Sequence, residues 1–188
     1  MADIDNDMKP ASAVFIDVPN VANKIANWRT GLKWERLSQA IAASEALVGT
    51  HLMLANAYVT KWDDREPLLD WKRGAFKTFG GTAFNMVVRH IDDVDSMIIE
   101  DMWSAVAQRE QESIREGILS YPIRMRFILV SGDGDYMRTI EKMKETYGEN
   151  LELELIVYSW NSKLAQVLVD GANRVYPLDN VPNFVRRD

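Results

Sequence analysis

The feature that most constrains this chain is a regular alternation of short apolar segments with amphipathic ones along almost its whole length. Five apolar segments have the length and residue types of buried strands, and each is followed by a segment with helical periodicity. A sixth, shorter strand is expected near the C-terminus. The expected strands are 12–20, 51–60, 82–91, 125–135, 151–160 and 174–178, and the expected helices are 32–49, 65–81, 92–118, 136–148 and 161–172.

Strands that alternate with helices are typical of βαβ units, whose crossovers are right-handed. We therefore predict an α/β fold of three layers, in which a mainly parallel central sheet of about five to six strands carries helices on both faces. The length of 188 residues suits one domain. We expect that domain at 12–180, between a disordered tail at 1–11 and a C-terminal tail at 181–188.

Composition removes several kinds of site. Cysteine is absent, which excludes disulfides, zinc–thiolate centres and cysteine nucleophiles, and only His51 and His90 could serve a histidine metal site. A net charge of −6 argues against a general affinity for nucleic acid, although a local basic rim remains compatible with it. No apolar segment is long enough to span a membrane, so we expect a cytoplasmic protein without a membrane partner.

Acidic residues follow most of the expected strands. Ligands of open α/β sheets bind beyond the carboxyl ends of the strands, so these acids are expected to converge on one edge. Clusters of oxygen ligands without histidine or cysteine suit Mg²⁺ or Mn²⁺. The candidate metal ligands are Asp17, Asp95, Asp133 and Asp135, with Asp101 as a secondary candidate and Asn20 beside Asp17.

The same residues also have structural interpretations. Asp17 could close an Asx turn, and Asp92 could cap the helix at 92–118. One of Asp133 and Asp135 could cap the next helix, and the glycines between them suggest that a ligand approaches the backbone closely. Further along the same edge are possible phosphate contacts and aromatic residues that could stack bases. These rim residues are Ser131, Lys61, Arg89, Arg138 and Lys163, and the aromatic Trp62, Tyr136 and Trp160.

Four segments resemble the motifs of NYN domains. "FIDVPNVANK" is similar to their first strand, "VDSMIIEDM" to a helix signature, "FILVSGDGDYMRTI" to their strongest motif, and "ANRVYPL" to their closing strand. The resemblance extends over residues 13–178. The family belongs to the PIN-like, Rossmann-related nucleases. It implies a Rossmann-like fold with an RNA-cleaving centre that uses Mg²⁺ or Mn²⁺, with Asp17, Asp95 and Asp133 as its acids here, joined by Asp135 and Asp101.

Three features depart from the family pattern. Val18 and Pro19 stand where a glycine usually follows the first aspartate, and Asn173 stands where many members have aspartate. The segment 108–121 is longer than the usual connection. It could form an extended helix for a protein partner, a homodimer contact or a substrate lid.

The sequence therefore predicts a metal-dependent ribonuclease that acts on single strands or loops, with endo- and exo-cleavage both left open. In this hypothesis Asp135 is a further ligand or orients water, and Asn20 positions the scissile phosphate. The alternative is a regulatory module that binds RNA or protein without efficient catalysis. A phosphatase of the haloacid-dehalogenase type is disfavoured because Pro19 occupies its second acidic position, and no glycine-rich loop supports a mononucleotide-binding module.

Overall fold

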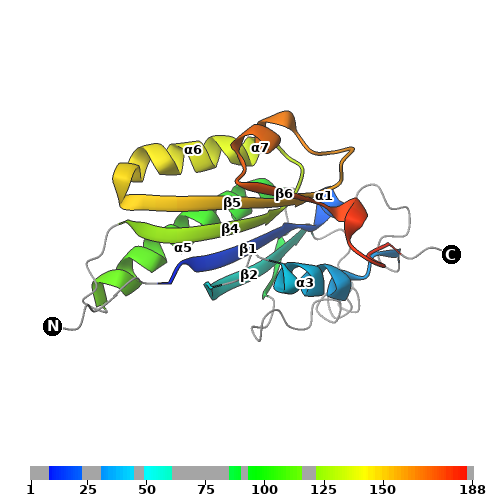
Figure 1. The fold of residues 1–188 in the computed structure, drawn as a ribbon, viewed down its shortest axis with the longest axis horizontal. Coiled ribbons are helices and arrows are strands. Elements are labelled where there is room, and N and C mark those ends of the chain that lie inside the picture. Colours follow the sequence, from blue (N-terminus) through cyan, green and yellow to red (C-terminus); the bar gives the residue numbers. More distant parts are fainter. Residues whose placement is uncertain are drawn as a thin grey trace.

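A computed structural model of the protein describes residues 9–22, 31–44, 49–60, 85–89, 93–115 and 122–185. Its centre is a six-stranded sheet in the order β3-β2-β1-β4-β5-β6, and every strand pairing is parallel (Figure 1). The predicted α/β class with a parallel sheet is confirmed. The strands are β1 (Ala11–Asp17), β2 (His51–Thr60), β3 (Asn85–Arg89), β4 (Ile123–Val130), β5 (Leu151–Ser159) and β6 (Arg174–Pro177).

The strand order reverses once, between β1 and β4. From β1 the chain moves outward to β2 and β3, and from β4 it moves outward in the other direction to β5 and β6. The pair Ile16 and Val130 is the last of the β1–β4 register. In open α/β sheets such a reversal of strand order marks the place where ligands bind, beyond the carboxyl ends of the strands.

Helices cover both faces of the sheet (Figure 1). Strand residues alternate between the faces: Val14 and Ile16 pack with α3, whereas Phe15 packs on the face of α5 and α6. Phe15 meets Phe127 edge to face at 5.2 Å between ring centroids. The helices are α1 (Val18–Ala22), α3 (Trp34–Ala43), α5 (Val94–Arg115), α6 (Asp135–Tyr147) and α7 (Gln166–Gly171), with 3-10 turns at Gly148–Asn150 and Leu178–Asn180.

Several predicted boundaries move. The first strand ends at Asp17, and Pro19 lies in the first turn of the short helix α1, where a missing N–H costs nothing. Helix α5 begins at Val94, and its cap is Asp93, whose carboxylate accepts a hydrogen bond from the backbone N–H of Ser96 at 3.0 Å. Asp92, the predicted cap, lies outside the described residues, as does the predicted helix 65–81. Residues 161–163 form a turn, so the helix expected from 161 begins later, with α7.

The segment expected as a C-terminal tail belongs to the domain. Phe184 is 1% exposed and lies between two tryptophans, 5.6 Å from Trp160 in a stacked arrangement and 5.8 Å from Trp34 edge to face. Val185 forms a bridge with Leu32. The boundary predicted at residue 180 is therefore too early. The sequence around Phe184 has no strand or helix pattern, and its partners are distant in the chain, so the sequence did not indicate this packing.

The N-terminal boundary and the long helix are linked by one contact. Arg109 of α5 is buried, and its guanidinium donates a hydrogen bond to the carbonyl oxygen of Lys9 at 2.9 Å, just before β1. Helix α5 continues to Arg115 and leaves the Ile114 side chain 54% exposed. Residues 116–121 lie outside the described residues, so a partner role for 108–121 stays a prediction. None of the described helices combines the length and apolar character that crossing a membrane requires.

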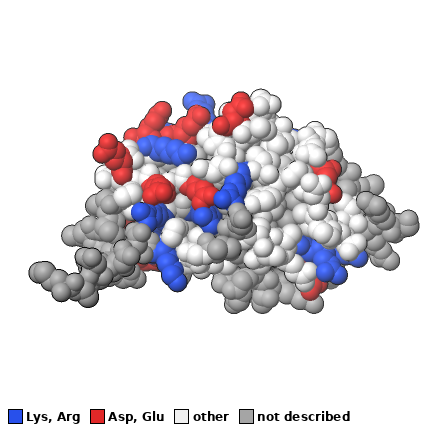
Figure 2. Space-filling view, viewed as in Figure 1, with Lys and Arg blue, Asp and Glu red and all other residues white. Residues whose placement is uncertain are grey.

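Charges of both signs are mixed on the face shown in Figure 2. Neighbouring strands pair them: Arg124 lies 3.1 Å from Glu152, and Arg126 lies 2.6 Å from Glu154. Opposite charges in contact cancel most of their field at a distance. This part of the surface therefore offers little long-range attraction to a polyanion.

Candidate active site

Two of the predicted acids, Asp17 and Asp95, meet where β1 and β4 end. Asp17 is the last residue of β1 and is only 3% exposed. Its Oδ1 accepts a hydrogen bond from the backbone N–H of Asn20 at 3.0 Å, and its Oδ2 accepts from the hydroxyls of Ser131 at 3.0 Å and Tyr136 at 3.2 Å. Burial raises the pKa of Asp17 to about 6, and the negative charge of Asp95 adds to this rise, whereas the three hydrogen bonds oppose it.

Tyr136 joins Asp17 to the second acid. Its hydroxyl lies 2.6 Å from Oδ1 of Asp95, in the first turn of α5, as well as 3.2 Å from Asp17. One hydroxyl hydrogen serves one acceptor at a time, and the shorter distance favours Asp95. Burial and the two carboxylates raise the pKa of Tyr136 far above its ordinary value, so the phenol stays protonated. Carboxylates from β1 and α5 thus converge on a hydroxyl from α6.

Asp133 is connected to this cluster through the backbone. Its N–H donates to the Ser131 hydroxyl at 3.2 Å, and its carboxylate accepts from the N–H of Asp135 at 3.0 Å, at the start of α6. The N-cap position of α6 is Gly134, without a side-chain cap, so neither acid takes the predicted capping role; Asp133 forms an Asx turn ahead of the helix. Asp135 is exposed in the first turn of α6. Ser131 is fully buried and links Asp17 to Asp133, so its expected role as a substrate contact is replaced by a structural one.

The helix α1 is fastened to the loops after β4 and β5. Oδ1 of Asn20 accepts the N–H of Gly132 at 3.0 Å, and the backbone carbonyl of Asn20 accepts from Nζ of Lys163 at 2.8 Å. The indole N–H of Trp160 donates to the carbonyl of Val21 at 2.9 Å. The side-chain oxygen of Asn20 therefore holds the loop of the strongest motif in place, and Lys163 brings an ammonium group to the same rim.

The glycines of this motif are required by the packing of the chain on itself. A Cβ on Gly132 would lie 2.5 Å from the carbonyl oxygen of Lys163, and one on Gly134 would lie 2.7 Å from Cγ1 of Val167. Both distances are shorter than real Cβ contacts. The close approach that the sequence suggested is real, but its partner is the segment after β5, whereas we expected a ligand.

Asp101 does not join the cluster. Its Oδ2 accepts from the hydroxyl of Tyr58 at 2.6 Å and from Nδ2 of Asn56 at 2.9 Å, both on β2. Six residues along α5 separate it from Asp95, about 9 Å along the helix axis. Burial, together with the hydrogen bond to Asp101, raises the pKa of Tyr58 well above its ordinary range. Asp101 therefore anchors α5 to the sheet, and its expected metal role is not supported by this geometry.

The expected stacking surface is also different. Trp160 is 6% exposed and stacks on Phe184, and Tyr136 is fully buried, so neither presents a ring to a nucleotide base. Both expectations are wrong because residues from distant segments cover these rings. Arg138 is exposed on α6, the side chain of Arg89 is not described, and Lys61 and Trp62 lie outside the described residues.

Sequence reasoning missed the function of two hydroxyl groups. The phenols of Tyr136 and Tyr58 each hold one α5 carboxylate at 2.6 Å. A weak signal existed, since each tyrosine stands on a buried position where phenylalanine would fill the same space. A buried phenol requires a hydrogen-bond partner, and the sequence could not tell which acid supplies it.

The fold and the site together define a class of protein. Six parallel strands in this order, with buried and half-buried acids at the switch point, describe a Rossmann-like α/β domain with an acidic site. The family model for the NYN domain matches residues 11–179, and the chain therefore belongs to the NYN domain family. The predicted family membership is confirmed.

One solved structure extends the comparison. The chain is similar to the crystal structure of a protein of unknown function from Vibrio parahaemolyticus, with a TM-score of 0.63 and 21% identity. The match covers 96% of this chain and 98% of the other. At this identity the likeness concerns the fold alone. No curated protein matches the sequence.

Proposed function

We propose that this protein is a divalent-metal-dependent ribonuclease that hydrolyses phosphodiester bonds in RNA. NYN domains are typically nuclease-like, and this chain belongs to the family over most of its length. The observation that carries the proposal is the meeting of Asp17 and Asp95 on one hydroxyl at the switch point of the sheet. A buried carboxylate with a raised pKa beside a second acid is typical of a functional site.

The donor set fits Mg²⁺ or Mn²⁺. Within the described ranges no three acidic, histidine or cysteine side chains form a ready-made metal cage. Mg²⁺ seldom needs such a cage, because it is usually held by one or two carboxylates, several waters and the phosphates of the substrate. Asp17 and Asp95 would supply the carboxylates, and Asp133 lies next to them through Ser131. An ion held there would supply an activated water and stabilisation of the leaving oxygen.

The remaining residues of the edge would handle the substrate. Lys163 lies beside Asn20, and Arg138 is exposed on α6 beyond the acids, so both can contact phosphates. The exposed carboxylate of Asp135 can orient the attacking water. The Ser131 and Asn20 contacts hold the carboxylate of Asp17 and the loop after β4 in fixed positions. Positioning of this kind contributes directly to rate.

The preferred substrate in this proposal is single-stranded or looped RNA in the cytoplasm. A net charge of −6 gives little attraction to a duplex, whose binding depends on neutralising many phosphates. Recognition of unpaired RNA relies more on stacking and hydrogen bonds to bases. Because Trp160 and Tyr136 are buried, Trp62 is the remaining candidate among the three predicted stacking residues.

A second function has its own supporting observation. The carboxylate of Asp133 and the amide oxygen of Asn20 both accept internal hydrogen bonds, from Asp135 and Gly132. A site whose polar groups serve the architecture suits a module that binds RNA or a protein without efficient cleavage. The alternative predicted from the sequence therefore stands beside the nuclease.

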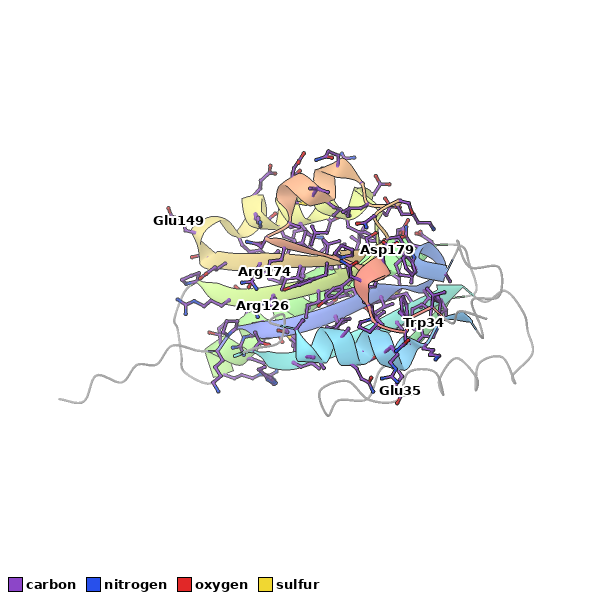
Figure 3. The ribbon with its side chains drawn as sticks, turned by 45° about the vertical axis from the view of Figure 1, so that its right-hand side comes forward. Trp34, Glu35, Arg126, Glu149, Arg174 and Asp179 are labelled. Atoms are coloured by element: carbon purple, nitrogen blue, oxygen red, sulfur yellow. The ribbon has the colours of Figure 1, made fainter. Side chains whose placement is uncertain are left out.

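Cleavage of labelled RNA tests the proposal. The purified protein is incubated with single-stranded and duplex RNA in Mn²⁺, Mg²⁺ or EDTA, beside Asp133→Asn, which keeps an oxygen that can accept from the N–H of Asp135. Glu149→Gln is the control, because Glu149 is exposed in the 3-10 turn before β5, whereas the acids of the site lie beyond the other ends of the strands. Figure 3 shows Glu149 at one end of the sheet and Asp179, which follows β6, at the other. We expect metal-dependent cleavage of single strands by the wild type and Glu149→Gln only. Cleavage that persists in Asp133→Asn or in EDTA contradicts the proposal, and binding without cleavage favours the second function.

A further inference from the structure

We propose that the hydroxyl of Tyr136 is a positioning group that sets the separation of the Asp17 and Asp95 carboxylates so that the pair holds one divalent cation. This inference rests on the proposed function. It starts from a geometric fact: a fully buried phenol oxygen lies 2.6 Å from one carboxylate and 3.2 Å from the other. The nuclease activity proposed above gives this oxygen no role of its own.

Packing alone does not explain the hydroxyl. The ring of Tyr136 belongs to the apolar layer under α5 and α6, together with Ile98 and Ile140, and phenylalanine would fill the same volume. Burying a phenol costs free energy unless its oxygen is hydrogen-bonded. Here the partners are two carboxylates that repel each other, and the hydroxyl lies within hydrogen-bonding distance of both and donates to one of them at a time. The oxygen thus fixes a distance between two charged groups.

Loss of the hydroxyl would affect the two acids unequally. Asp17 keeps its hydrogen bonds from Ser131 and from the backbone of Asn20, and it is closed off from solvent. Asp95 is half-buried in the first turn of α5. Among the residues that the structure describes, the donor to its carboxylate is the Tyr136 hydroxyl. Without the phenol, repulsion from Asp17 favours rotation of Asp95 towards water. Groups that orient metal ligands typically change affinity 10- to 100-fold when removed.

The chain contains a matched control for this change. Tyr58 is equally buried, and its hydroxyl donates to Asp101 on the same helix at the same distance of 2.6 Å. Asp101 lies about 9 Å further along α5, away from the cluster. Tyr58→Phe therefore removes an equivalent anchor of α5 without touching either proposed ligand. A merely structural role for Tyr136 predicts the same effect for both variants.

Calorimetric titration of the metal-free proteins with Mn²⁺ at pH 7.5 tests the inference. We expect Tyr136→Phe to bind about 10- to 100-fold more weakly than the wild type, with Tyr58→Phe unchanged and with similar melting temperatures for the two metal-free variants. Equal affinities of Tyr136→Phe and the wild type overturn the positioning role alone, as does equal weakening in both variants. A wild type that binds no Mn²⁺ overturns the proposed metal site and this inference with it.

A second pair of variants covers the case in which Tyr136→Phe does not fold. Asp95→Asn removes the charge that repels Asp17 and keeps an oxygen that can accept from the Tyr136 hydroxyl. When Tyr136→Phe is added to Asp95→Asn, the loss of the hydroxyl therefore no longer leaves two carboxylates facing each other. If Tyr136 acts through Asp95, the double variant binds Mn²⁺ as Asp95→Asn does. A further loss of affinity in the double variant shows that the hydroxyl does not act through Asp95, and overturns the inference.

Discussion

Replacing Asp17 by asparagine should stabilise the metal-free protein at neutral pH. The wild-type carboxylate is buried, and the charge of Asp95 lies nearby, so the folded state disfavours its ionised form. Asparagine has the same shape and no charge. Its oxygen can accept from the backbone of Asn20, and its amino group can donate to the hydroxyl oxygens of Ser131 and Tyr136, which are able to accept as well as donate.

The magnitude follows from the two pKa values of Asp17. The folded pKa is about 6, against 3.8 for the unperturbed group. The folded state therefore binds the proton more tightly, and the free energy of unfolding falls as pH rises from the unfolded pKa to the folded pKa. Over the whole range this costs the wild type about 3 kcal/mol, of which about 2 kcal/mol falls between pH 4.5 and pH 7.5. The asparagine variant lacks this loss.

Urea denaturation in EDTA at pH 4.5, 6.0 and 7.5 measures the effect. The relevant quantity is the difference in the free energy of unfolding between Asp17→Asn and the wild type, because the titration of all other groups cancels in it to first order. This difference should shift by about 2 kcal/mol in favour of the variant from pH 4.5 to pH 7.5. Glu149→Gln, at an exposed site, is the control and should show no such shift.

A difference that stays constant across these three pH values would refute the reasoning. It would mean that Asp17 does not bind its proton more tightly in the folded protein, and that burial and Asp95 do not act on it as the geometry implies. A shift in the opposite direction would show that the hydrogen bonds from Ser131, Tyr136 and Asn20 outweigh burial.

Three further predictions concern the metal and the packing around the site. Mn²⁺ at one hundred times its dissociation constant should stabilise the wild type by about 2.7 kcal/mol; differential scanning fluorimetry should show a rise in melting temperature that EDTA reverses, and an unchanged value contradicts the metal site. Gly132→Ala should cost about 1–3 kcal/mol because its Cβ would collide with the backbone oxygen of Lys163; stability equal to the wild type in urea would contradict this close approach. Phe184→Ala should lower the free energy of unfolding by about 3–5 kcal/mol, because it empties the space between Trp34 and Trp160. A decrease below 1 kcal/mol, roughly that of a mild surface change, would show that the C-terminal segment does not belong to the core.

The order of strands and helices could be read from the sequence because it depends on local pattern. The apolar run Phe127–Val130 is buried on both sides, as a central parallel strand requires, and the period of α6 places Tyr136, Ile140 and Met143 on one buried face. The family motifs then identified Asp17 and Asp95, which the structure brings to one hydroxyl. These features follow from residues close to one another in the chain.

The partners of the polar and aromatic side chains could not be read in this way. Trp160 directly follows β5, a position that suits an exposed ring, yet Phe184 covers it from a segment that has no strand or helix pattern. Asp101 lies on the helix of Asp95, but a tyrosine of β2, 43 residues away, takes its carboxylate.

The sequence by itself determined which segments form strands and helices and which end of the sheet carries the acids. The tertiary structure alone decided which of those acids share a site, which rings are covered, and that Tyr136 stands between Asp17 and Asp95. The physical reason is the parallel topology. Every strand pair needs a crossover, so the neighbours of a side chain come from segments dozens of residues away, and no local pattern records which segment arrives.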